Sequence, residues 1–326
     1  MPDTPAISVR NLTKRYPQSN SNAVDGVSFE VERGGIFGLL GPNGAGKTTT
    51  IGVLTTAVVP SGGEASIMGF DVVREQVRVK QRIAVVPQRP NLDRSLLVRE
   101  ILTFHAAYHG VPRREREAHA DQLLKELGLF ERRNEKADRY SGGMSQRLMI
   151  ARALMHKPDV LFLDEPTNNL DPQSRLFLWE RIRALNEQGL TILLTTHDMD
   201  EADQLCQRIA IMDLGRILVN DTPAELKKLI PGGNSLELHV ETGEPAGLTE
   251  RFAALPGVTK VEEVPSTDPE AELGVTSFHV YAAEAGALVG AAAQAILEAG
   301  ARVRDIRVRQ ATLEEVFIYL TGKHLR

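Results

Sequence analysis

The stretch that decides the fold is GPNGAGKTT, which comprises Gly41, Pro42, Asn43, Gly44, Ala45, Gly46, Lys47, Thr48 and Thr49. It matches the pattern G-x-x-x-x-G-K-[ST] and lies between a predicted strand and a predicted helix, which is the context this motif requires. The glycines let backbone N–H groups turn toward phosphate oxygens, and a helix N-terminus adds a favourable dipole. The stretch therefore predicts a phosphate-binding loop, in which Lys47 reaches the β- and γ-phosphates and the Thr48 hydroxyl binds Mg²⁺.

Short apolar runs separated by helical-length sequence predict the strands of a mainly parallel sheet: Ile36 to Leu40, Ile83 to Val86, Val160 to Leu163 and Thr191 to Thr195. Continuous hydrophobicity suits strands that are buried on both faces. The first run leads into the glycine-rich stretch, and the others lead into Gln88, Asp164-Glu165 and His197. Because ligands of open α/β sheets bind outside the carboxyl ends of the strands, we expect these polar groups to converge.

Alternating hydrophobicity predicts further strands on either side of this core. Two of them, at Ile7 to Leu12 and Val24 to Val31, are expected to be antiparallel strands that flank the sheet. Two more, Ile209 to Met212 and Arg216 to Val219, predict a hairpin closed at Asp213 to Gly215.

Residues 89–157 predict a helical subdomain inserted into the sheet. Apolar residues at spacings of i, i+4, i+7 and i+11 predict one apolar stripe: Leu97, Ile101, Phe104 and Tyr108. A second helix is predicted from another apolar set, which comprises Leu123, Leu124 and Leu127. Gly128 directly follows this set and is expected to end the helix.

A domain boundary is predicted at Pro231 to Asn234, between a domain at 1–230 that contains the phosphate-binding loop and an accessory domain at 235–326. The second domain reads as β-α-β-β-α-β, from SLELHVE at 235–241 to ARVRDIRVRQ at 301–310, which predicts a small α+β ferredoxin-like fold. A last helix is expected at Thr312 to Leu320, with a capping box at its start.

Composition limits the classes of function that are open. With 42% hydrophobic residues, 25% charged residues and a formal charge of -5, the 326-residue chain has no basic footprint for nucleic acid. The lone Cys206 supports neither a disulfide nor a zinc site, so a reducing cytoplasm is expected. We expect no signal peptide, and no window reaches the roughly 18 apolar residues of a membrane span.

The segment Tyr140 to Arg147, YSGGMSQR, resembles the signature LSGGQxQR of ABC transporter ATPases, with Tyr140 and Met144 as departures. Other segments resemble that family's Walker B, D-loop and switch-histidine motifs in their usual order: LFLDEP at 161–166, NNLD at 168–171 and TTHD at 195–198. The resemblance covers about the first 230 residues. It implies a P-loop ABC ATPase cassette that hydrolyses ATP with Mg²⁺.

Phosphoryl transfer to water needs a held metal and a positioned nucleophile. We expect Asp164 to hold Mg²⁺ and Glu165 to act as general base. The resemblance implies that Gln88 senses Mg²⁺ and the attacking water. His197 is expected to contact the γ-phosphate, whereas the other histidines, including His105, His109 and His119, are expected at the surface.

The resemblance also implies that subunits pair head to tail, most simply as a homodimer, around shared ATP. Ser141, Gly142 and Gly143 of one subunit would then cap the γ-phosphate held by the other. Independently, a serine and two glycines before a helix offer N–H groups that suit an anion, although SGG alone could be a plain helix cap. Asp171 is expected at the subunit interface, with an Asp-Pro turn as the alternative. Tyr16 is expected to stack on adenine rather than merely to pack.

The ending TLEEVFIYLTG, at 312–322, and residues 195–226 resemble daunorubicin-type resistance ATPases of the ABC-2 exporter group. We therefore expect the chain to lie at the cytoplasmic membrane face and to power a separate multi-span permease, which docks near Phe104 and Tyr108. The expected cargo is a drug, lipid or polysaccharide-like substrate. The alternatives are a methionine-type importer with a regulatory C-terminal domain, and a soluble ABC ATPase of translation or DNA repair.

Overall fold

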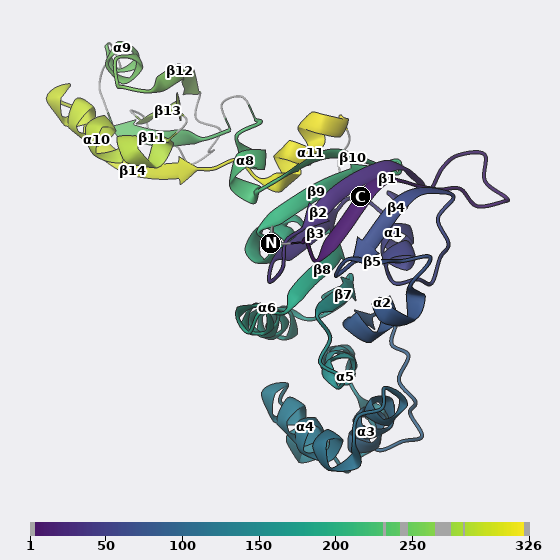
Figure 1. Cartoon of the computed structure of the whole chain (residues 1–326). Coiled ribbons are helices and arrows are strands. Elements are labelled where there is room, and N and C mark those ends of the chain that lie inside the picture. The colour runs from purple at the N-terminus through teal and green to yellow at the C-terminus, as the bar shows by residue number, and fades with distance from the viewer. Residues whose placement is uncertain (1–3, 231–232, 242–246, 265–274, 283, 323–326) are drawn as a thin grey trace. The chain divides into compact units, whose positions relative to one another are not determined.

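The computed structural model describes residues 4–230, 233–241, 247–264, 275–282 and 284–322 (Figure 1). The chain forms two compact units that divide between Pro223 and Ala224. The domain ranges expected from the sequence remain a prediction. Pro231 and Gly232 of the expected boundary, and residues 265–274 of the expected accessory domain, lie outside the described residues.

The first unit contains a six-stranded sheet with the order β10-β9-β3-β8-β7-β6. Its strands are β3 (Ile36–Leu40), β6 (Ile83–Val86), β7 (Val160–Asp164), β8 (Thr191–Thr196), β9 (Arg208–Asp213) and β10 (Arg216–Asp221). The apolar runs expected to be parallel strands are confirmed, since β6, β7, β8 and β3 pair in parallel. The expected hairpin is β9-β10, and its strand β9 extends the parallel core by pairing with β3.

A separate four-stranded antiparallel sheet has the order β2-β1-β4-β5. It comprises β1 (Ile7–Lys14), β2 (Val24–Val31), β4 (Gly62–Ile67) and β5 (Phe70–Asp71). Apolar residues from both sheets share one core, in which the rings of Phe29 on β2 and Phe37 on β3 stack with centroids 5.0 Å apart. This shared core fixes the flanking sheet against the face of the parallel one.

Helices of the first unit follow the strand ends or form the insert. The helices outside the insert are α1 (Lys47–Leu54), α2 (Gln76–Arg82), α6 (Pro172–Glu187) and α7 (Met199–Leu205), while α8 (Pro223–Lys227) spans the division between the units. The insert consists of α3 (Val98–Tyr108), α4 (Arg113–Glu126) and α5 (Gly142–Leu154), which lie together at one end of this unit (Figure 1). The expected single apolar stripe on α3 is corrected: Ile101 is buried, but Phe104 is 54% and Tyr108 88% exposed.

The second unit has the element order expected from the sequence. Its elements are β11 (Ser235–Glu241), α9 (Leu248–Ala253), β12 (Val258–Val264), β13 (Val275–Ala282), a 3-10 turn (Ala285–Leu288), α10 (Val289–Glu298), β14 (Arg302–Arg309) and α11 (Leu313–Thr321). All pairs in the sheet order β12-β13-β11-β14 are antiparallel, which confirms the ferredoxin-like arrangement. The capping box at the start of α11 is also confirmed, between Thr312 and Glu315. In the described part of the chain, no helix has the length and apolar character needed to cross a membrane.

Candidate active site

The glycine-rich stretch connects β3 to α1 at the carboxyl edge of the parallel sheet. Gly46 has a φ of 103°, and a Cβ atom there would collide with the carbonyl oxygen of Ala23. Gly41 is packed as closely, against the carbonyl oxygen of Met212, and its N–H donates to the carbonyl of Thr196 at 3.2 Å. The glycines therefore allow close backbone packing that holds the loop over the helix. First-turn N–H groups of α1 have no partner within the helix and suit a phosphate.

Lys47, the first residue of α1, is only 4% exposed. Its Nζ donates to the carbonyl oxygens of Gly41 at 2.6 Å and Pro42 at 3.1 Å, and it lies 3.6 Å from Oε1 of Glu165. Burial lowers the pKa of Lys47, and the Glu165 carboxylate opposes that shift. The side chain is thus a buried cation held over the loop, where phosphate oxygens can replace or join its present oxygen partners.

Asp164, at the end of β7, lies beside two hydroxyl groups. Its Oδ1 accepts from Thr195 Oγ1 at 2.5 Å and from Thr48 Oγ1 at 3.3 Å. Asp164 and Thr195 are also partners in the β7-β8 pairing, so the sheet register itself brings them together. A carboxylate and a hydroxyl at the edge of a phosphate loop are the hard oxygen donors that Mg²⁺ prefers, so these residues fit that ion.

Glu165 follows Asp164 and is the centre of the polar cluster. Its side chain is 7% exposed. Its Oε2 accepts from Gln88 Nε2 at 2.7 Å and from Asn168 Nδ2 at 3.1 Å. Its Oε1 lies 3.4 Å from Nδ1 of His197, in addition to the Lys47 contact. Groups that follow β3, β6, β7 and β8 thus meet at one carboxylate, which is the convergence expected at this sheet edge.

The backbone of Glu165 has a positive φ of 48°, in the left-handed region that non-glycine residues avoid. Its N–H is held by Thr195, through the carbonyl oxygen at 3.0 Å and Oγ1 at 3.1 Å. A strained residue of this kind persists only where its surroundings fix it, and such residues cluster at functional sites.

The signature segment forms a second part of the candidate site. Ser141 is the N-cap of α5, and its hydroxyl accepts from the N–H of Met144 at 3.2 Å. Gly143 lies against α6, where a Cβ atom on it would come within 2.6 Å of Ser174 Oγ. Asp171 caps α6 by accepting from the N–H of Ser174 at 2.9 Å, and this bonding lowers the pKa of Asp171. The signature turn and the NNLD segment are therefore neighbours.

Ser141, Gly142, Gly143 and Asp171 are separate from the Glu165 cluster in their hydrogen bonding. Within the described ranges, no hydrogen bond or ion pair joins these residues to the phosphate loop. The Gly142 backbone is exposed at the start of α5 and faces Leu170. The structure of one chain thus leaves this turn accessible for another ligand or chain.

Tyr16 follows the end of β1 and is 39% exposed, with Lys14 Nζ 5.1 Å from its ring centre. The carbonyl of Lys14 accepts from the N–H of Ala23, whose own carbonyl oxygen packs against Gly46. These contacts bring the Tyr16 segment close to the phosphate loop.

Sequence reasoning gave no individual role to several residues of the cluster. Asn168 binds Glu165, and Thr195 binds both Asp164 and the Glu165 backbone. Glu201 of α7 is 1% exposed and accepts from Thr167 at 2.7 Å and Trp179 at 3.3 Å. The polar residues within NNLD and TTHD could have indicated these roles. A strand end that carries one site residue often also carries the residues that hydrogen-bond to it.

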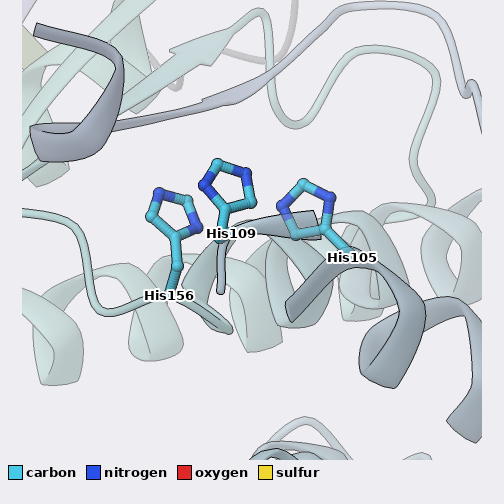
Figure 2. Close-up of side chains that lie close together, drawn as sticks. All are labelled: His105, His109 and His156. Atoms are coloured by element: carbon cyan, nitrogen blue, oxygen red, sulfur yellow. The ribbon is translucent and has the colours of Figure 1, made fainter. Parts of the chain in front are cut away.

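The expectation that the remaining histidines lie at the surface is corrected for five described histidines, which are half-buried: His105, His119, His156, His239 and His279. Two of these, His105 and His156, have neighbouring rings. They lie beside the exposed His109, with ring centroids 5.8 Å apart for His105 and His156 and 3.9 Å for His109 and His156 (Figure 2). The sequence hid this group because His156 is distant along the chain from the other two.

A buried lysine over the glycine-rich loop after β3, with an acidic pair at the end of β7, defines a P-loop nucleoside triphosphatase. Within that class, the family model described as "ABC transporter" matches residues 24–168, which include both features. The chain belongs to the ATP-binding proteins of ABC transporters, because relatives at 35–39% identity match it over 98–100% of its length. It therefore binds and hydrolyses ATP.

Relatives extend the match over the full chain. It is 39% identical to the daunorubicin resistance ATP-binding protein DrrA3 of Streptomyces coeruleorubidus, over 100% of this chain and 98% of the relative. It is 35% identical to the linearmycin resistance ATP-binding protein LnrL of Bacillus subtilis, over 98% of this chain and 99% of the relative. It is 38% identical to the Nod factor export ATP-binding protein I of Burkholderia thailandensis, over 98% of each. The resemblance to resistance ATPases is confirmed.

Solved structures match the first unit's type of fold. An ATP-binding subunit of an ABC transporter gives a TM-score of 0.63 at 31% identity, covering 69% of this chain and 92% of that one. A dimeric ATP-binding cassette in a post-hydrolysis state, bound to ADP and Pi, gives a TM-score of 0.61 at 27% sequence identity. This match covers 66% of this chain and 98% of that one. The α/β cassette expected from the sequence is confirmed.

Proposed function

We propose that this chain is the ATPase of an exporter, binds Mg²⁺ with ATP, and drives a separate multi-span permease from the cytoplasmic membrane face. The observation that carries the catalytic part is the Glu165 carboxylate, which is buried among Gln88, Asn168 and His197 beside the phosphate loop. The export part is supported by the relatives, whose names refer to daunorubicin resistance, linearmycin resistance and Nod factor export.

The phosphate loop would bind the nucleotide. Backbone N–H groups from Gly41 to Thr49 and the positive end of α1 would face the phosphates, and Lys47 would place its charge on the β- and γ-phosphates. Thr48 and Asp164 would hold Mg²⁺, with Gln88 nearby. The ion supplies neutralisation of the charge on the phosphate oxygens. Tyr16, which is 39% exposed, would stack its ring on adenine.

Glu165 would act on the attacking water. Its carboxylate would accept the water's proton, while Gln88 and Asn168 hold that carboxylate in place through their amide N–H groups. His197 would donate to the γ-phosphate. Because Lys47 lies 3.6 Å from Glu165, a bound γ-phosphate competes with the carboxylate for the same cation. Substrate binding would thereby release Glu165 for its role as base.

A second subunit would complete the site. Ser141 and Gly142 are exposed at the start of α5, and Gly143 follows as a buried residue of the first turn. A helix N-terminus of this kind suits an anion. These residues would cap the γ-phosphate held by the partner subunit, and Asp171 would lie at the same interface. The dimeric cassette among the structural neighbours supports the pairing of two subunits, and the head-to-tail arrangement of a homodimer is part of this proposal.

The docking surface for the permease would include Phe104 and Tyr108, the exposed aromatic residues of α3. The test is to purify the tagged full-length chain from membranes and to identify a co-purifying multi-span protein by mass spectrometry. Phe104→Glu and Tyr108→Glu should reduce its recovery, whereas Val77→Glu on α2, also exposed, should not. Recovery that is equal for all variants would refute this surface, and a chain found with no membrane protein would refute the transport role.

A methionine-type importer is the second candidate, because its ferredoxin-like regulatory domain has the same kind of fold as the second unit. Equilibrium dialysis of the full chain with small amino acids separates the two functions. The exporter assignment predicts no saturable binding.

A further inference from the structure

Three histidines form a cluster outside the ATPase site. His105 lies on α3, His109 caps the end of α3, and His156 follows the end of α5 (Figure 2). One potential ligand nitrogen from each ring lies within 4.8 Å of the others. The spacing of four residues between His105 and His109 places both on one face of a helix, and the packing of α3 on α5 brings in the third.

The orientation of His156 is fixed by a hydrogen bond. Its Nε2 lies 2.9 Å from the carbonyl oxygen of Ile83, the first residue of β6. A carbonyl oxygen can only accept, so Nε2 carries the proton and Nδ1 presents a lone pair. That Nδ1 atom is buried and has no hydrogen-bond partner among the described residues. Metal-binding histidines commonly have this arrangement, in which the second nitrogen donates to a backbone carbonyl.

His105 presents a second unsatisfied nitrogen. Its Nε2 is also buried without a hydrogen-bond partner in the described structure. Unpaired buried polar atoms are costly, and they require an explanation such as an ion. Burial lowers the pKa of His105 to about 4 and also lowers the pKa of His109 and His156, so all three rings are held in the neutral form that binds metals.

We propose that His105, His109 and His156 bind a divalent transition-metal ion, with Zn²⁺ as the preferred ion. Neutral imidazoles without thiolate ligands suit Zn²⁺, Ni²⁺ or Cu²⁺ rather than Mg²⁺ or Ca²⁺. Three nitrogen ligands would leave a fourth position for water. The rings of His109 and His156 are stacked with an interplanar angle of 6°, so one must turn to bind the same ion. His109 is exposed, and its ring can do so.

One neighbouring charge opposes the ion. The Arg152 guanidinium is close enough to disfavour a second positive charge at His105, although it is held by Asn91 through Oδ1 at 2.5 Å and the carbonyl oxygen at 3.2 Å. Only an ion with strong affinity for imidazole compensates for that repulsion, which favours a transition metal over an alkaline-earth ion.

A bound ion would connect parts of the chain that otherwise only pack together. It would join the end of α3 to the segment after α5, which is itself bonded to the start of β6. The same strand leads to Gln88 in the catalytic cluster. The metal would therefore restrain the helical insert against the sheet. This inference does not depend on the exporter function.

The test is calorimetric titration of the metal-free full-length chain with Zn²⁺, in excess Mg²⁺. The wild type should bind one ion through this cluster, and His105→Ala, His109→Ala and His156→Ala should each weaken binding at least about tenfold, the loss expected even for an outer partner of a metal site. The matched control is His119→Ala, since His119 lies on α4 and bonds instead to Leu154. That variant should bind as the wild type does.

Two further measurements keep the result decisive. His197→Ala identifies any Zn²⁺ bound at the catalytic cluster, because it removes a ligand there and leaves the His105 cluster intact. ATP affinity of the exposed-site variant His109→Ala should match the wild type, which shows that the chain remains folded. Absence of Zn²⁺ binding by the wild type, or binding unchanged in both His105→Ala and His109→Ala, would overturn the proposal.

Discussion

Replacement of Glu165 by Gln tests the centre of the proposed mechanism. The amide has nearly the same shape as the carboxylate, and its oxygen can still accept from Gln88 or Asn168. What it loses is the ability to take a proton from water. A positioned general base contributes about 100- to 10,000-fold, so kcat should fall by that factor and the barrier should rise by about 2.7–5.4 kcal/mol.

ATP binding should respond differently from turnover. The phosphate loop, Lys47 and Thr48 are untouched by the substitution, and the negative charge 3.6 Å from Lys47 Nζ is removed. Lys47 then has no carboxylate competing with the phosphate, so ATP affinity should stay equal or increase. Loss of turnover with retained binding is the signature of a group needed for the chemical step.

The assay is phosphate release at saturating ATP, with ATP affinity measured in parallel by a fluorescent nucleotide. Glu180→Gln, an exposed substitution of the same chemistry on α6, serves as the control and should retain wild-type turnover. Hydrolysis by Glu165→Gln within tenfold of the wild type would refute the role of Glu165 as base.

Other perturbations probe the remaining parts. Lys47→Ala should weaken ATP binding about 10- to 100-fold in a nucleotide titration, because charged hydrogen bonds contribute about 1.5–3 kcal/mol; unchanged affinity would contradict this. Light scattering should show that Glu165→Gln dimerises with ATP but not with ADP, and that adding Ser141→Arg abolishes the dimer. A dimer that persists in the double variant would refute the proposal that Ser141 caps the partner subunit's nucleotide. Burial raises the pKa of Glu201 above its ordinary value of 4.5 in the folded protein. The folded state therefore loses stability relative to the unfolded state as the pH rises through this raised pKa. The side chain in Glu201→Gln does not ionise, so the Tm of the variant relative to that of the wild type should increase as the pH rises above 4.5; a constant Tm difference would refute this.

The parallel core was predictable because its determinants are local. Strands buried on both faces are continuously apolar, and the runs at 36–40, 83–86 and 160–163 have no polar interruption. The positions of the polar residues that follow these runs were predictable for a related reason, since the carboxyl ends of all parallel strands meet at one edge of the sheet. Gln88, Glu165 and His197 could therefore be placed together before any contact was known.

Features that depend on contacts across the fold were not predictable in this way. Strand β4 begins with two glycines and pairs with β1, and the two-residue β5 pairs with β4, so both strands exist through their pairing rather than through a pattern of their own. The split stripe on α3 has the same cause, because spacing identifies one helix face but does not say how far its neighbours cover it. His156 joins His105 only through the packing of α5 on α3.

The conformation and burial of Glu165 each reduce the stability of the fold, so selection for stability does not explain them. A non-glycine residue in the left-handed region costs about 1–3 kcal/mol, and a buried carboxylate needs partners to offset its desolvation. Lys47, Gln88 and Asn168 supply those partners, and Thr195 holds the backbone in its strained form. A glycine here would relieve the strain and an apolar side chain would remove the buried charge. The fold instead fixes a carboxylate beside the phosphate loop, which is the position that the proposed role of Glu165 as general base requires.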